Sequence, residues 1–168
     1  IPLIAYHTAS ANFSLKLPQG FYGYLLDNAA NKTIDAIITT NPPPQVVWQG
    51  TVSGNWDTTS ANWKDGLKFL DGAPVTFDDT ASGATTVNVV GTVAPGEVLV
   101  TNTAKTYTFT GGTLAGTSLM RKEGTGSLVM NAPSQLPLAL NAGTVTGSGT
   151  LGTTTVAPSA RPARISTR

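Results

Sequence analysis

The chain contains no cysteine and a single histidine, His7, among its 168 residues. Without cysteine there are no disulfides, so the sequence does not reveal the redox compartment in which the protein works. One histidine cannot supply the clusters of His and Cys ligands that bind zinc. A Ser-His-Asp triad would depend on His7, and no Gly-x-Ser-x-Gly segment lies beside it. These absences predict a protein that is not an enzyme.

Charge is also scarce, because only 11% of the residues are charged and the formal net charge is +1. A nucleic-acid-binding protein usually carries a basic surface that displaces counterions, so nucleic acid is not expected as a partner. Disordered chains combine low hydrophobicity with high net charge, whereas 40% of these residues are apolar. The composition therefore predicts a folded protein with a neutral, hydroxyl-rich surface.

Long apolar runs are missing as well. Residues 36–38 and 136–140 are the longest candidates, and a membrane-spanning helix needs about 20 apolar residues, so no membrane span is expected. Helical periodicity persists nowhere for as many as ten residues. The chain begins at Ile1 without a methionine or a leader, so we expect a processed protein or a piece of a longer one.

The N-terminal part contains segments that alternate apolar and polar residues. Residues 13–17, 21–26 and 33–38 show this pattern, which predicts strands of a small antiparallel β unit over residues 1–41. Three prolines follow within residues 42–45, and because proline donates no backbone hydrogen bond, this segment is expected to end the sheet and act as a linker.

Residues 46–84 hold all three tryptophans, Trp48, Trp56 and Trp63, separated by turn-forming Gly, Ser and Asn residues. We predict a compact Trp-rich cap here. From residue 85 to residue 156, short runs of Thr and Val recur between glycines and prolines. The predicted strands in this part are residues 86–90, 97–101, 106–110, 118–121, 127–130, 138–140 and 144–146.

Strands of this length and spacing suit a β-sandwich or a β-solenoid. No two-residue hairpin turn of the Asn-Gly kind joins neighbouring strands, and the turns are asymmetric and glycine-rich, as at Gly111-Gly112 and 147–149. These features favour an all-β, right-handed parallel β-solenoid, with a β-sandwich as the alternative. Residues 157–168 are rich in Pro and Arg and are predicted to form a flexible tail.

Several motifs resemble those of the autotransporter-associated β-strand repeat proteins, which are secreted bacterial β-helices. The motifs are Trp48-x-Gly50, Gly54-Asn-Trp56, Ala61-Asn-Trp63, 75–79, 86–88, 106–109, 112–116 and 122–128. The resemblance covers roughly residues 46–131, and residues 13–40 resemble the end of a preceding module. It implies export to the bacterial cell surface or medium, a right-handed parallel β-helix, and mostly non-catalytic roles in adhesion, in display or as accessory modules of polysaccharide-degrading proteins.

Polysaccharide recognition would need aromatic faces for the apolar sides of sugar rings and polar groups for their hydroxyls. The aromatic candidates are Trp48, Trp56, Trp63, Tyr22, Tyr24 and Tyr107, and the polar candidates are Asn55, Asp57, Asn62 and Asp65. Each aromatic candidate has an alternative role. The tryptophans could form the core of the cap, and the Tyr22 and Tyr24 side chains could pack across strands.

Two further carboxylates, Asp78 and Asp79, are weak candidates for binding calcium, the one cofactor considered. A paired-carboxylate mechanism could also use Asp78 with Asp79, or Asp57 with Asp65. Adjacent residues of a strand point to opposite faces, however, so Asp78 and Asp79 are not expected to converge. Capping of turns is the alternative role for these acids.

Together these features predict a secreted, non-catalytic module that binds extracellular polysaccharide or mediates adhesion to a cell surface. One alternative is a structural spacer or a self-assembling filament subunit, because an uncapped solenoid end can add strands from a second copy, head to tail. A second alternative is a glycosidase or lyase that uses carboxylates.

Overall fold

The computed structural model describes residues 2–5, 21–28 and 30–158. The chain forms two compact units, Ile1–Pro43 and Pro44–Arg168. The boundary falls inside the proline-rich segment 42–45. His7, the predicted strand 13–17 and most of the predicted tail lie outside the described residues. The described part of the chain has no helix of the length and apolarity needed to cross a membrane.

The first unit is a three-stranded antiparallel sheet with the order β1-β3-β2. Its strands are β1 (Pro2–Ala5), β2 (Tyr22–Asn28) and β3 (Thr33–Thr39). β2 and β3 correspond to the predicted segments 21–26 and 33–38, whereas β1 was not predicted. In β3 the alternating residues Ile34 and Ala36 are buried, as the period of two along a strand requires.

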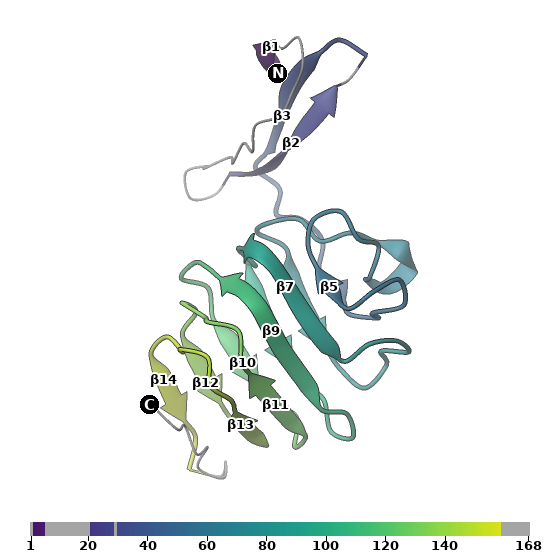
Figure 1. The fold of residues 1–168 in the computed structure, drawn as a ribbon. Helices are drawn as coiled ribbons and strands as arrows, with labels where there is room; N and C mark the ends of the chain where they lie inside the picture. The colour runs from purple at the N-terminus through teal and green to yellow at the C-terminus, as the bar shows by residue number, and fades with distance from the viewer. Residues whose placement is uncertain (1, 6–20, 29, 159–168) are drawn as a thin grey trace. The chain divides into compact units, whose positions relative to one another are not determined.

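The second unit is built from two parallel sheets, between which the chain alternates (Figure 1). The six-stranded sheet contains β4 (Val46–Val47), β6 (Pro74–Phe77), β8 (Glu97–Val100), β10 (Met120–Lys122), β12 (Leu138–Leu140) and β14 (Thr154–Val156). The five-stranded sheet contains β5 (Asn55–Trp56), β7 (Thr86–Val93), β9 (Tyr107–Leu114), β11 (Ser127–Met130) and β13 (Thr144–Thr146).

Every ladder between these strands is parallel. The chain crosses from one sheet to the other and then returns to pair with its previous strand in the first sheet. This is the repeating turn of a parallel β-solenoid, so the predicted architecture is confirmed. The sandwich alternative needs antiparallel neighbours joined by hairpins or Greek-key connections, so it does not describe this unit.

The turns of the solenoid shorten along the chain. Val46 pairs with Val75 across a turn of 29 residues, whereas Leu138 pairs with Thr154 across a turn of 16 residues. The first turn is longest because it carries the loop with the short 3-10 helix η1 (Lys64–Gly66). The solenoid therefore starts at β4. The predicted division into a cap at 46–84 and coils from residue 85 is corrected, since the tryptophan-rich segment is itself the first turn.

Side chains that point inward stack in columns between the two sheets. One column of the six-stranded sheet contains Val46, Val75, Val98, Met120 and Leu138 in register, and all five are buried. At the N-terminal end of the core the three tryptophans gather, as predicted. The ring centroids of Trp48 and Trp63 are 5.1 Å apart, and those of Trp56 and Trp63 are 5.7 Å apart.

Glycines at the corners let the backbones of successive turns approach closely. A Cβ atom on Gly112 would lie 1.8 Å from the carbonyl oxygen of Gly91, and one on Gly147 would lie 2.1 Å from that of Met130. Gly147 also has a φ of 132°, which side chains disfavour. The glycine punctuation of the sequence is therefore a requirement of stacking.

Candidate functional site

The three tryptophans cannot act as sugar platforms, because their exposed fractions are 0% for Trp48 and Trp56 and 1% for Trp63. Tyr107 is also fully buried, and its hydroxyl donates to the backbone oxygen of Asp78 at 2.6 Å. Trp48 Nε1 likewise donates to the Ala84 carbonyl oxygen at 2.7 Å. These four aromatic candidates are core residues, which corrects their place in the predicted site.

The remaining aromatic candidates, Tyr22 and Tyr24, belong to β2 of the first unit. Tyr22 is half-buried and pairs with Thr39. The side chain of Tyr24 lies outside what the structure describes. No aromatic residue among the described candidates of the second unit therefore offers a face to a ligand.

Asn62, a polar candidate, is buried and serves the turn that precedes β5. Its Oδ1 accepts from the backbone nitrogens of Val52 and Ser53 at 3.1 and 2.8 Å. Its Nδ2 donates to Ser53 Oγ and to the Asn55 carbonyl oxygen, both at 2.8 Å. An asparagine amide has two donors and two acceptor lone pairs, so Asn62 has no capacity left for a ligand.

Asp57 caps a turn of its own segment. Its Oδ1 accepts from the backbone nitrogens of Thr59 and Ser60 at 2.8 and 2.5 Å. Partial burial opposes ionisation of this carboxyl group, but the hydrogen bonds from Ser60 and Thr59 outweigh it and lower its pKa. Asp57 is therefore held as a carboxylate by its own turn.

Asp78 and Asp79, the calcium candidates, are occupied in the same way. Asp78 Oδ1 accepts from the backbone nitrogen and the hydroxyl of Thr80 at 2.8 and 2.6 Å. Asp79 accepts from the hydroxyl and backbone nitrogen of Thr103 and the backbone nitrogens of Ala104 and Lys105, and these bonds hold its pKa far below the usual range.

A calcium ion would have to displace these donors to reach Asp79, whereas both donors to Asp78 bond to its Oδ1. Within residues 2–5, 21–28 and 30–158, no group of three or more His, Cys, Asp or Glu side chains is placed to hold a metal ion. Calcium binding therefore stays a prediction.

Asp65 lines an open depression of about 440 Å³ near the start of the solenoid. The lining residues are Gln49, Thr51, Trp63, Lys64, Asp65, Gly66 and Thr80. The backbone of Asp65 is left-handed, with a φ of 61°, and it is followed by Gly66 at 71°. Asp65 is the one carboxylate of the depression, whereas glycoside hydrolysis uses two. The predicted partner Asp57 does not line it.

A second surface is the outer face of the five-stranded sheet, which we call the hydroxyl face. Its inward residues, such as Val87, Phe109 and Leu128, are buried in the core, so the alternate residues point outward. The outward residues are Asn55, Thr86, Asn88, Val90, Thr92, Thr108, Thr110, Thr113, Ser127, Val129, Thr144 and Thr146. None of the five strands contains a charged residue.

Strand register divides this face into rows. The central row contains Thr86, Thr108, Val129 and Thr146, one residue from each of four successive strands. The hydroxyl groups of Thr86, Thr108 and Thr146 make no hydrogen bond to any residue that the structure describes. The central row therefore offers free donors and acceptors on a half-exposed to exposed surface.

The rows on either side are already hydrogen-bonded to themselves. In one, Asn88 Nδ2 donates to Asn55 Oδ1 at 3.0 Å. In the other, the hydroxyl oxygens of Ser127 and Thr144 lie 3.2 Å apart. Asn55 is thus the one sequence-predicted site residue on the hydroxyl face, and the free threonines of the central row were not predicted.

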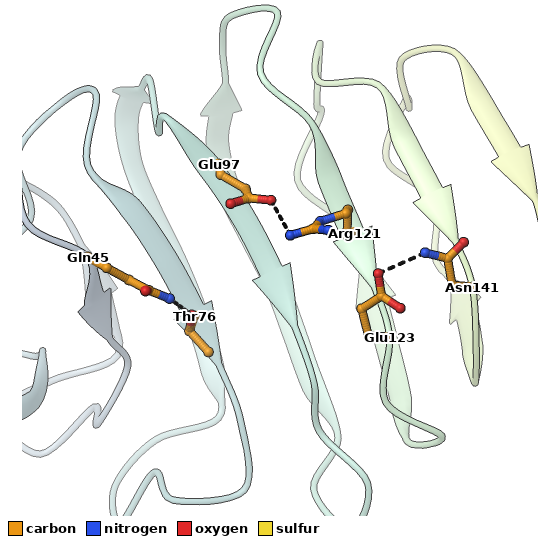
Figure 2. Close-up of polar contacts among 6 residues, drawn as sticks. All are labelled: Gln45, Thr76, Glu97, Arg121, Glu123 and Asn141. Atoms are coloured by element: carbon orange, nitrogen blue, oxygen red, sulfur yellow. Dashed lines mark hydrogen bonds and ion pairs between the residues drawn. The ribbon is translucent and has the colours of Figure 1, made fainter. Parts of the chain in front are cut away.

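The six-stranded sheet differs, because its polar side chains pair with one another (Figure 2). Arg121 Nη2 lies 2.6 Å from Glu97 Oε1, and Asn141 Nδ2 donates to Glu123 Oε1 at 2.8 Å. Gln45 Nε2 donates to Thr76 Oγ1 at 2.6 Å. This face carries charged side chains that pair with one another, whereas the five strands of the hydroxyl face carry none.

No family model, curated protein or solved structure matches this chain. The resemblance to autotransporter-associated repeat proteins therefore stays a prediction.

Proposed function

We propose that the second unit is a non-catalytic module that binds polysaccharide outside a bacterial cell, through its hydroxyl face. The observation that carries the proposal is the central row, in which the hydroxyl groups of Thr86, Thr108 and Thr146 bond to no described residue and lie on strands without a charged residue. Where the polysaccharide coats a cell, the same binding is adhesion.

The chemistry of the row suits sugars. A threonine hydroxyl is one donor and two acceptor sites, so it can meet a sugar hydroxyl in either sense. The methyl groups of the threonines and of Val129 offer apolar contact to the C–H faces of sugar rings. Nucleic acid would need cations opposite its phosphates, and the five strands contain none.

Removal of the free hydroxyls should weaken binding without unfolding the protein. We expect the wild-type protein to be retarded in affinity gels that contain soluble polysaccharides. Exchange of Thr86, Thr108 and Thr146 for valine should raise the Kd by about tenfold or more, since each lost hydrogen bond is worth about 0.5–1.5 kcal/mol. Valine favours strands at least as well as threonine, so the thermal midpoint should stay unchanged.

Thr155→Val is the matched control, because Thr155 is an exposed threonine on the six-stranded sheet. This variant should bind as the wild type does. Equal retardation of the triple variant and the wild type would contradict the proposal, and so would a wild-type protein that binds no polysaccharide of a broad panel.

A second candidate function is self-assembly into a filament, and the C-terminal end of the solenoid supports it. Within the described residues, which end at residue 158, β13 and β14 each pair on one side only. Val156 continues the inward column after Leu140 and is 48% exposed. Unpaired strand edges above an exposed apolar residue can add strands from a second copy.

If the protein assembles into filaments, electron microscopy of the purified protein should show them as unbranched fibres. Val156→Glu should prevent them, because the new carboxylate would have to be buried between stacked copies. Thr155→Glu, one position along the same strand, is the matched control, since Thr155 lies on the outer face. A wild-type protein that stays monomeric at high concentration would rule out this function.

A further inference from the structure

We infer that the ligand of the hydroxyl face is a neutral, extended, β-linked glycan that lies across the strands, along the direction in which the turns of the solenoid stack. This inference rests on the proposed function and gives it a substrate class and a binding direction. It follows from the register of the central row, from the bonding of the rows beside it and from the distribution of charge.

The free groups define a line. Thr86, Thr108, Val129 and Thr146 lie on four neighbouring strands, and neighbouring strands are about 4.8 Å apart. Along β9 the next outward residue after Thr108 is Thr110, whose hydroxyl already points to the Val87 carbonyl oxygen at 3.5 Å. Unpaired hydroxyls therefore recur on neighbouring strands along the central row, whereas along β7 and β9 the next described unpaired hydroxyls, those of Thr92 and Thr113, lie six and five residues farther on.

The repeat of this line suits an extended chain of sugars. Thr108 and Thr146 are separated by one strand, as are Thr86 and Val129, so each pair spans about 9–10 Å. A flat β-linked glycan with a two-fold screw turns the same edge toward a surface once every two sugars. One edge can then bond to Thr108 and Thr146 while the sugar between these contacts lies over the methyl groups of Val129. A helically coiled α-linked glycan does not present such an edge.

The charge distribution selects a neutral ligand. The five strands of the hydroxyl face contain no Lys or Arg. A uronic acid or sulfate group on the row would lose hydration without gaining a cation. On the other sheet Arg121 is held by Glu97, and it lies on the opposite side of the core.

Three soluble polymers separate these properties when their Kd values are measured by affinity gel electrophoresis. Hydroxyethylcellulose is neutral and β-linked, carboxymethylcellulose is β-linked and anionic, and amylose is neutral and α-linked. We expect hydroxyethylcellulose to bind at least tenfold more tightly than either of the other two polymers.

Two single variants test the binding direction. Thr146→Val removes a hydroxyl of the same row as Thr108, and Thr110→Val removes one from the same strand as Thr108. We expect Thr146→Val to raise the Kd for hydroxyethylcellulose about fivefold and Thr110→Val to leave it unchanged. The thermal midpoints of both variants serve as the control for folding.

The outcomes distinguish the inference from the proposed function. Tighter binding of amylose or carboxymethylcellulose that still depends on Thr108 would overturn the ligand class and leave polysaccharide binding in place. A larger loss from Thr110→Val than from Thr146→Val would overturn the direction. If the protein bound none of the three polymers, the inferred ligand class would be wrong. If it also bound no polysaccharide of the broad panel, the proposed function would be wrong as well.

Discussion

Replacement of Trp56 with alanine is expected to lower the free energy of unfolding by about 3–5 kcal/mol and the thermal midpoint by roughly 10 °C. Trp56 is fully buried. Its ring centroid lies 5.3 Å from that of Phe77, 5.5 Å from that of Phe69 and 5.8 Å from that of Phe109. Alanine would leave a cavity between both sheets that these rings can fill only in part. Urea denaturation measures the loss.

Trp56→Phe is the matched control. It keeps an aromatic ring and removes an indole Nε1 that is buried without a hydrogen-bond partner among the described residues, so the cost should be much smaller. If Trp56→Ala were as stable as the wild type, the aromatic cluster would not hold the first turns together. If Trp56→Ala instead lost polysaccharide binding while its stability stayed unchanged, Trp56 would be a ligand-binding residue.

Replacement of Lys122 with methionine is expected to stabilise the protein at pH 7 by about 2–3 kcal/mol. Lys122 is 0% exposed and stands in an inward column between Val100 and Leu140. Its Nζ donates to the Gly124 carbonyl oxygen. Burial lowers its pKa from 10.5 to about 8, and the charges of Asp79 and Glu123 compensate only in part. Methionine has similar length and carries no charge to desolvate.

The pH dependence of stability follows from the same lowered pKa. Between about pH 8 and pH 10.5 the unfolded chain keeps the Lys122 proton and the folded chain has lost it. The unfolded state then binds more protons, so the stability of the wild-type protein should rise with pH across this window. Below pH 8 both states are protonated, and the full cost of the buried ammonium remains.

Urea denaturation at pH 7 to pH 10 measures this slope, which should be absent in Lys122→Met. Above pH 10 Tyr107 acts in the opposite sense, because its burial and the charges of Asp78 and Asp79 raise its pKa in the folded state. Lys68→Met, at an exposed position, is the control and should change neither stability nor slope appreciably. A less stable Lys122→Met variant would mean that the bond to Gly124 outweighs the desolvation of the ammonium.

The sequence predicted much of the fold because the features that encode it are local. Alternation of apolar and polar residues marks β7, β9 and β11, and this period of two is visible in any one strand. Glycines such as Gly112 and Gly147 mark the corners because any side chain there would meet the backbone of the neighbouring turn. β4 and β5 were not predicted as solenoid strands, since two residues each are too few to show a period.

The site was predicted less well, because exposure depends on what packs against a side chain. Tryptophans suit a sugar platform and an aromatic core equally, and only the packing of both sheets around Trp48, Trp56 and Trp63 buries them. Polar candidates such as Asn62 and Asp79 accept hydrogen bonds from the backbone nitrogens of turns. Residues 106–110 show the Thr-x-Thr alternation that could have pointed to the hydroxyl face.

The sequence by itself determined that this protein is a nearly neutral, disulfide-free chain of short strands, and it favoured a solenoid over a sandwich, because composition, strand period and corner glycines are properties of neighbouring residues. Only the tertiary structure decided which groups are free. Thr86, Thr108 and Thr146 come into one row through strand register across three turns of chain. Lys122 is buried because its column lies between two sheets, and no local pattern encodes either arrangement.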